Sequence, residues 1–76
     1  MVSQTLGSRL RQLRHERGLT LLALAGDARL STSYLADIEH DRTVPTLGRL
    51  QAVAEALQLS VRDLLQGVVP YDAPDG

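Results

Sequence analysis

The chain has 76 residues, enough for one small domain that buries only about 60% of its unfolded surface, and a second domain is excluded. It has no cysteine for disulfides or thiolate metal sites and no apolar run long enough to cross a bilayer, so we expect a cytoplasmic protein. The formal net charge is −1, which argues against an overall basic surface for nucleic acid.

Composition favours helices. Hydrophobic residues make up 43% of the chain and aromatic residues only 3%, a usage that suits helix packing better than sheets and disfavours stacking of single-stranded bases. The charge is uneven, because residues 1–50 carry +2 and residues 51–76 carry −3. Every basic residue is arginine, whose planar fork suits phosphates and base edges, although a genome rich in G and C would favour arginine as well.

The first predicted helix covers about residues 5–17. Leu6, Leu10 and Leu13 recur at helical spacing, and Gly18 follows as the usual left-handed stop. A second, short helix is predicted over residues 21–28.

Thr20 precedes this second helix, and its hydroxyl can cap the free amides of the first turn. Gly26 within the helix costs about 1 kcal/mol relative to alanine, and we expect it to permit close approach of another helix.

A third helix is predicted to begin after Ser31, which repeats the capping chemistry. Leu35 and Ile38 are expected to face inward, and the helix is expected to end near Asp41. Only residues 29–30 separate it from the preceding helix, so the two helices must cross steeply.

Two more helices complete the chain. Pro45 stops the third helix from running on, and Thr46 caps a fourth over residues 47–57. Ser60 caps a short fifth helix, with Asp63 at the reciprocal position of a capping box.

A projecting second helix of such a pair suits a DNA major groove. The stretches LTLLALAGDARLSTSYLADIEHDRTVPTLGRLQAVAEAL and QLSVRDLL resemble the Cro/CI-type helix-turn-helix family (the XRE family) from Leu6 to about Leu65. Within it, LRQLRHERGL, YLADIEHDRTVP and VRDLLQGV are most similar to DdrO-type repressors of the deinococcal radiation response. The resemblance implies an all-α, five-helix, lambda-repressor-like DNA-binding domain, with the helix-turn-helix formed by the second and third helices.

The resemblance further implies that the third helix reads bases with its N-terminal end. Carried onto this chain, the base-contacting residues are Thr32, Ser33 and Asp37, whose carboxylate can accept a hydrogen bond from cytosine N4. The residues expected on phosphates are Thr20, Leu21, Ser31, Tyr34, Arg42, Thr43 and Arg9.

Several of these residues have a simpler interpretation. Ser31 is also a plain helix cap, and Tyr34 also covers the edge of the core. Asp37 is either a base-reading residue or a solvated partner of Arg42, and Arg9 is either a phosphate contact or a surface charge.

The resemblance also implies a structural ion pair between Arg14 and Glu39. Two residues depart from the family pattern. Arg29 stands where a glycine is common, so we expect a left-handed backbone at a cost of roughly 1–2 kcal/mol. Leu21 stands where many members have a glutamine, which leaves only backbone amides for a phosphate.

The predicted function is a sequence-specific DNA-binding transcriptional regulator, a repressor that binds a palindromic operator on double-stranded DNA as a homodimer. Residues 1–67 form the DNA-binding domain, and residues 68–76 form a flexible tail or a linker to a dimerisation region absent from this chain. The alternative is a helical protein-interaction module, such as an antitoxin of a toxin–antitoxin pair, supported by the negative charge and exposed Leu21 and Leu22.

Catalysis is not expected, because the sequence has no nucleophile elbow, phosphate loop or carboxylate pair. His15 and His40 lie on different helices without a carboxylate cluster, so no metal and no cofactor are expected.

Overall fold

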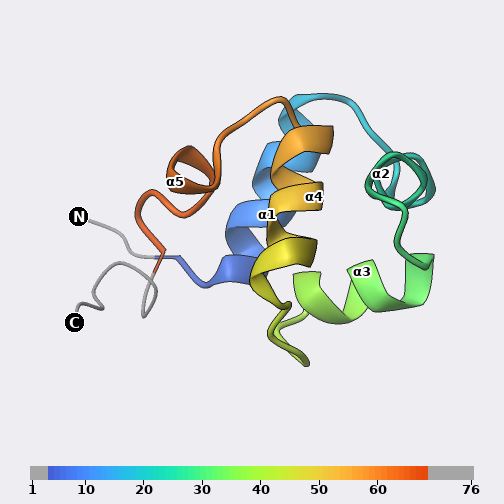
Figure 1. Cartoon of the computed structure of the whole chain (residues 1–76), viewed down its shortest axis with the longest axis horizontal. Helices are drawn as coiled ribbons and strands as arrows, with labels where there is room; N and C mark the ends of the chain where they lie inside the picture. Colours follow the sequence, from blue (N-terminus) through green and yellow to red (C-terminus); the bar gives the residue numbers. More distant parts are fainter. Residues whose placement is uncertain (1–3, 69–76) are drawn as a thin grey trace.

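The computed structural model describes residues 4–68, which form five helices (Figure 1). Their bounds are α1 Leu6–Glu16, α2 Leu21–Ala28, α3 Thr32–Glu39, α4 Leu47–Ala56 and α5 Val61–Leu64. The predicted helices are confirmed, with ends that differ by at most a few residues. The described residues contain no strand, only an isolated parallel bridge between Gln4 and Val68. None of their helices has the length and apolar character needed to cross a membrane.

Every helix begins in the same way. The residue before its first turn is a serine or threonine whose side-chain oxygen accepts a hydrogen bond from the amide three residues on, at 3.0–3.3 Å. These caps are Thr5, Thr20, Ser31, Thr46 and Ser60. At α5 only this half of the predicted capping box forms, because the Asp63 amide donates to Ser60 and the described hydrogen bonds include none accepted by the Asp63 carboxylate.

The core collects the apolar stripe of each helix. Its largest fully buried side chains are Leu10, Leu24, Leu35, Ile38, Val53, Leu57, Leu64 and Val68. Val68, expected to begin the tail, is fully buried, so the domain extends at least through it. Residues 69–76, predicted as the rest of the tail, lie outside the described residues.

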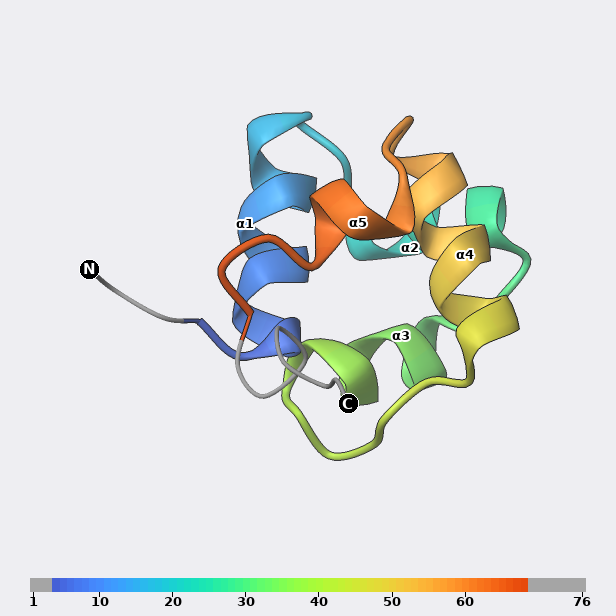
Figure 2. The same cartoon turned by 60° about the vertical axis from the view of Figure 1, so that its left-hand side comes forward.

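Helix α3 packs on both α1 and α2, while α4 packs on α2 and α5 (Figure 2). The contact between α1 and α3 is close at Gly7, where an added Cβ would lie 2.4 Å from the carbonyl oxygen of Glu39 and 2.6 Å from that of Ile38. Gly26 has nothing within 4 Å of the same added atom, so the expectation of a close approach at Gly26 is wrong, since that face of α2 meets open space.

Arg14 and Glu39 form a buried ion pair that joins α1 to the end of α3. The Arg14 guanidinium donates from Nε to Glu39 Oε2 at 2.7 Å and from Nη2 to Oε1 at 3.1 Å, and its Nη1 donates to the Leu19 carbonyl at 2.9 Å. The exposed fraction of the side chain is 12% for Arg14 and 3% for Glu39. No buried side-chain polar atom of the described residues lacks a hydrogen-bond partner, and each nitrogen of the Arg14 guanidinium makes a hydrogen bond.

Asp41, just after α3, caps the distant α1. Its Oδ1 accepts a hydrogen bond from the amide of Gly7 at 2.9 Å, and its Oδ2 accepts one from the Thr5 hydroxyl at 2.7 Å. Asp41 adopts a left-handed backbone with φ of 58°, which aspartate tolerates better than most residues. A carboxylate at a helix N-terminus is stabilised by the free amides and the helix dipole, so Asp41 fixes the loop after α3 onto α1.

Candidate nucleic-acid interface

The turn between α2 and α3 sets how α3 projects. Arg29 has φ of 60° and ψ of 40°, the left-handed conformation expected at this position, and the amide of Leu30 returns to the Ala25 carbonyl at 2.9 Å. Helix α3 then starts two residues later. In Figure 1, α2 is seen nearly end on while α3 runs across the view, so the two helices cross steeply and α3 lies along one side of the molecule.

The residues of α3 divide into an inner and an outer face. Leu35, Ile38 and Glu39 are buried. The residues that are exposed or half-buried include Thr32, Ser33, Ala36, Asp37 and, just beyond the helix, His40. We call these five residues the α3 stripe, because spacings of three and four residues place most of them on one side of the helix.

The three residues predicted to contact bases all belong to this accessible stripe. Ala36 and His40 were missed by sequence reasoning, although their spacing of three and seven residues from Ser33 signals the same face. The Nδ1 of His40 lies 2.8 Å from the Ala36 carbonyl, which orients the imidazole beside the stripe.

Asp37 pairs with Arg42 across 3.3 Å, from its Oδ1 to Nη1, and the side chains remain 46% and 64% exposed. The alternative interpretation of Asp37 as a partner of Arg42 therefore describes this structure. An exposed pair of this kind is worth about 0–1 kcal/mol, so it leaves both groups available to an outside partner.

Most of the residues expected on phosphates lie at the starts of α2 and α3 or in the loop after α3. Thr20 and Ser31 are exposed helix caps. Each hydroxyl accepts a hydrogen bond from a backbone amide and still has its own hydrogen to donate. Leu21 is half-buried at the first position of α2, and Thr43 is half-buried in the loop after α3. Tyr34 is half-buried against the core, so it covers the core edge and keeps part of its ring accessible.

Arg9 has a different position from the one expected. Its Nε donates to the Leu64 carbonyl at 3.1 Å and its Nη2 to the Asp63 carbonyl at 2.9 Å. The guanidinium thus satisfies carbonyls at the C-terminal end of α5. These contacts favour a structural role for Arg9 over contact with a phosphate.

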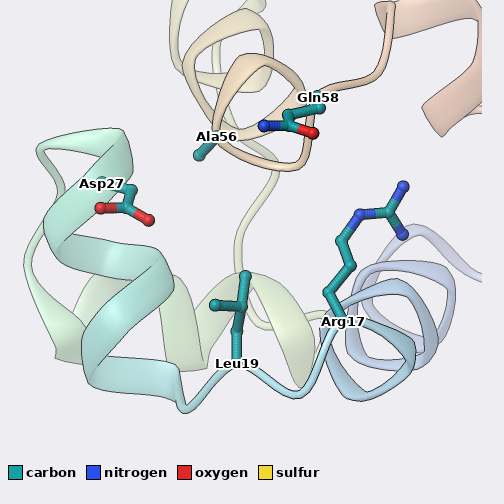
Figure 3. Close-up of a pocket in the computed structure, with 5 residues that line it drawn as sticks. All are labelled: Arg17, Leu19, Asp27, Ala56 and Gln58. Atoms are coloured by element: carbon teal, nitrogen blue, oxygen red, sulfur yellow. The ribbon is translucent and has the colours of Figure 1, made fainter.

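The surface of residues 4–68 includes two shallow hollows that bear on the site. One, of about 280 Å³, is shown in Figure 3. Arg17 and Asp27 lie on opposite sides of this hollow with Leu19 between them, and the Arg17 Nε already donates to the Leu57 carbonyl at 2.9 Å. The other hollow, of about 360 Å³, lies at the start of α3. The described residues hold no group of three metal-ligating side chains.

A profile of the helix-turn-helix domain family matches residues 7–69. The chain is 51% identical over 63 residues to the HTH-type transcriptional regulator DdrOP3 of Deinococcus deserti, covering 83% of this chain and 49% of that protein. It is 54% identical over 57 residues to the immunity repressor protein of Bacillus phage phi105, covering 75% and 40%. The chain therefore spans about half the length, or less, of these curated relatives.

Solved structures show the same arrangement of helices. The DNA-binding domain of the P22 c2 repressor superposes with a TM-score of 0.81 at 31% identity, covering 88% of each chain. SinR, the master regulator for biofilm formation, solved in complex with DNA, superposes with a TM-score of 0.75 at 39% identity, covering 80% of this chain and 98% of that one. The P22 c2 repressor has also been solved with a synthetic operator.

Proposed function

The chain belongs to the Cro/CI-type (XRE) helix-turn-helix family of DNA-binding transcription regulators, which are not enzymes, and on that premise we propose that it acts as the DNA-reading part of a repressor. The observation that carries the proposal is the α3 stripe. Short side chains are accessible there, whereas the opposite face of α3 is buried and anchored to α1. A helix with this profile can approach base edges closely in the major groove.

In this proposal Thr32, Ser33 and Asp37 contact base edges. The two hydroxyls donate or accept, and the Asp37 carboxylate accepts a hydrogen bond from cytosine N4. Ala36 lies on the same stripe and offers its methyl group to a thymine methyl. Two hydroxyls, a carboxylate and a methyl group along one helix are enough to distinguish sequences.

The phosphate contacts flank the stripe. The first amides of α2, at Leu21 beside Thr20, point outward from a helix N-terminus and favour an anion. Ser31 and Tyr34 contribute hydroxyls at the start of α3. Arg42 and Thr43, which follow the C-terminal end of α3, are the remaining proposed phosphate contacts.

We further propose that two copies act together as a homodimer. One domain makes few contacts, so useful affinity requires two half-sites about one helical turn, or 10–10.5 base pairs, apart. A twofold dimer would bind a palindromic operator and repress by occupying a promoter. The protein would do this work in the cytoplasm, which agrees with a chain without cysteine.

Selection of duplexes from a random pool, followed by affinity measurements over a salt series, tests the proposal. We expect an inverted repeat and a linear fall of log K with log salt, with a slope of about −0.9 for each phosphate contact. The second candidate is a protein-interaction module, favoured by the 71% exposure of Leu22 on α2. Such a module would select no common sequence and would show no salt slope with duplex DNA.

A further inference from the structure

The hollow at the start of α3 is lined by two arginines from separate elements. Arg29 comes from the turn between α2 and α3, and Arg49 comes from the first turn of α4. Leu30, Ser31 and Tyr34 form the rest of the lining, which contains no carboxylate. The hollow is therefore a concave surface with two positive charges and no negative one.

Neither arginine is neutralised within the described part of the chain. The ion pairs there are those of Arg14 and of Arg42. The Arg49 guanidinium instead lies over the ring of Tyr34, with its Cζ 5.1 Å from the ring centroid. This cation–π contact orients the guanidinium beside the start of α3 and leaves its N–H groups without a protein acceptor among residues 4–68.

Arg29 occupies its position despite an unfavourable backbone. Its φ of 60° is one that glycine adopts readily and that other residues adopt rarely. Arg29 is exposed, and the ion pairs of residues 4–68 do not include it, so its guanidinium is available to an external partner. A guanidinium matches the oxygens of a phosphate in a bidentate arrangement.

We propose that this hollow binds one phosphate of the DNA backbone, held by Arg29 and Arg49 on either side of Ser31 and Tyr34. The proposal rests on the function proposed above, since the hollow adjoins the α3 stripe and a backbone strand runs beside any helix in the major groove. The two arginines fix the register of α3 on the duplex. They also account for how a chain of net charge −1 gains affinity for DNA.

The salt dependence of duplex binding tests this directly. In the full chain, Arg29→Gln and Arg49→Gln are each expected to make the slope of log K against log salt less negative by about 0.9. Over a fourfold rise in salt, each variant should therefore lose about 3.5-fold less affinity than wild type loses. The preferred sequence should stay the same. Arg62→Gln is the control, because Arg62 is an exposed arginine on α5, away from the α2–α3 turn in Figures 1 and 2, and should leave the slope unchanged.

Arg29→Gly separates a DNA contact from a structural role. Glycine relieves the left-handed backbone, so the variant should unfold at a higher temperature than wild type. It should nevertheless bind the selected duplex more weakly and with the smaller salt slope. A variant that is more stable and binds as tightly as wild type would overturn the proposal.

Duplexes with a single uncharged methylphosphonate locate the contact. Wild type should lose affinity when one particular phosphate is replaced, and Arg49→Gln should be insensitive at that position. If wild type binds the duplex but the arginine variants keep its slope and its methylphosphonate pattern, the phosphate site is wrong and the proposed function stands. If wild type itself shows no salt-dependent duplex binding, both proposals fail.

Discussion

The Arg14 guanidinium and the Glu39 carboxylate face each other in two hydrogen bonds, 2.7 Å from Nε to Oε2 and 3.1 Å from Nη2 to Oε1. Because Glu39 is the last residue of α3, this pair ties α3 to α1 from the inside. The orientation of the α3 stripe thus depends on a charge pair whose carboxylate is buried and whose guanidinium is only 12% exposed.

Arg14→Met should destabilise the domain by about 3 kcal/mol or more, because it leaves the Glu39 carboxylate buried without a cation while the apolar stem is kept. Urea unfolding followed by circular dichroism measures the change. Arg62→Met, at an exposed position, should shift stability by less than about 0.5 kcal/mol. Equal stabilities for the two variants would show that the buried pair contributes nothing.

Gly7→Ala should cost about 1–3 kcal/mol, because its Cβ would overlap the Glu39 and Ile38 carbonyls and push α1 away from α3. Gly26→Ala is the matched control in another helix, where the added methyl meets open space. That control should raise stability by about 0.5–1 kcal/mol through helix propensity alone. Thermal unfolding of both variants gives the comparison, and a stabilising effect at Gly7 would contradict the close contact.

Asp41→Ala should lower stability by about 2 kcal/mol, since it removes the cap on α1 at about 1 kcal/mol and places alanine in a left-handed backbone at about 1 kcal/mol more. Asp41→Asn should cost less, because asparagine tolerates the backbone and keeps an oxygen for the Gly7 amide. Denaturant titrations rank the two variants. Finding asparagine as harmful as alanine would assign the effect to charge rather than capping.

Asp37→Ala should reduce the difference in binding free energy between the preferred base pair and the other base pairs at one position of the selected site by about 1–3 kcal/mol. The preferences at the other positions should not change. Arg42→Gln, its partner in the exposed ion pair, serves as the comparison. That change should weaken all duplexes alike and reduce the salt slope by about 0.9. Affinities for the selected duplex and single-base variants check both, and a uniform effect of Asp37→Ala would remove Asp37 from base readout.

Local chemistry made most of the helices predictable. The hydroxyl caps at Thr20, Ser31, Thr46 and Ser60 each act on an amide three residues away, so the information lies within one turn of chain. The left-handed conformation of Arg29 was predicted through the family resemblance, because glycine is common at this position of the turn.

Contacts between distant segments were not predictable in this way. The sequence predicted only that a helix ends near Asp41, yet Asp41 caps a helix that begins 35 residues earlier. Gly7 looks like an ordinary helix residue until α3 packs against it, and Arg9 looks like a surface charge until the end of α5 supplies its carbonyl acceptors. In each case the deciding partner is set by packing, and the pairing of Arg14 with Glu39 was reached only through the family resemblance.

The bridge between Gln4 and Val68, supported by the hydrogen bond from the Gln4 amide to the Gly67 carbonyl at 3.1 Å, brings the two ends of the described chain to one place. A short peptide could therefore join these two positions without moving the helices. A circular permutant that joins these ends by a short peptide and opens at the turn around Gln58 would keep α2, the turn and α3 uninterrupted. A module joined directly at Gln4 or at Val68 would likewise leave the domain from this one place.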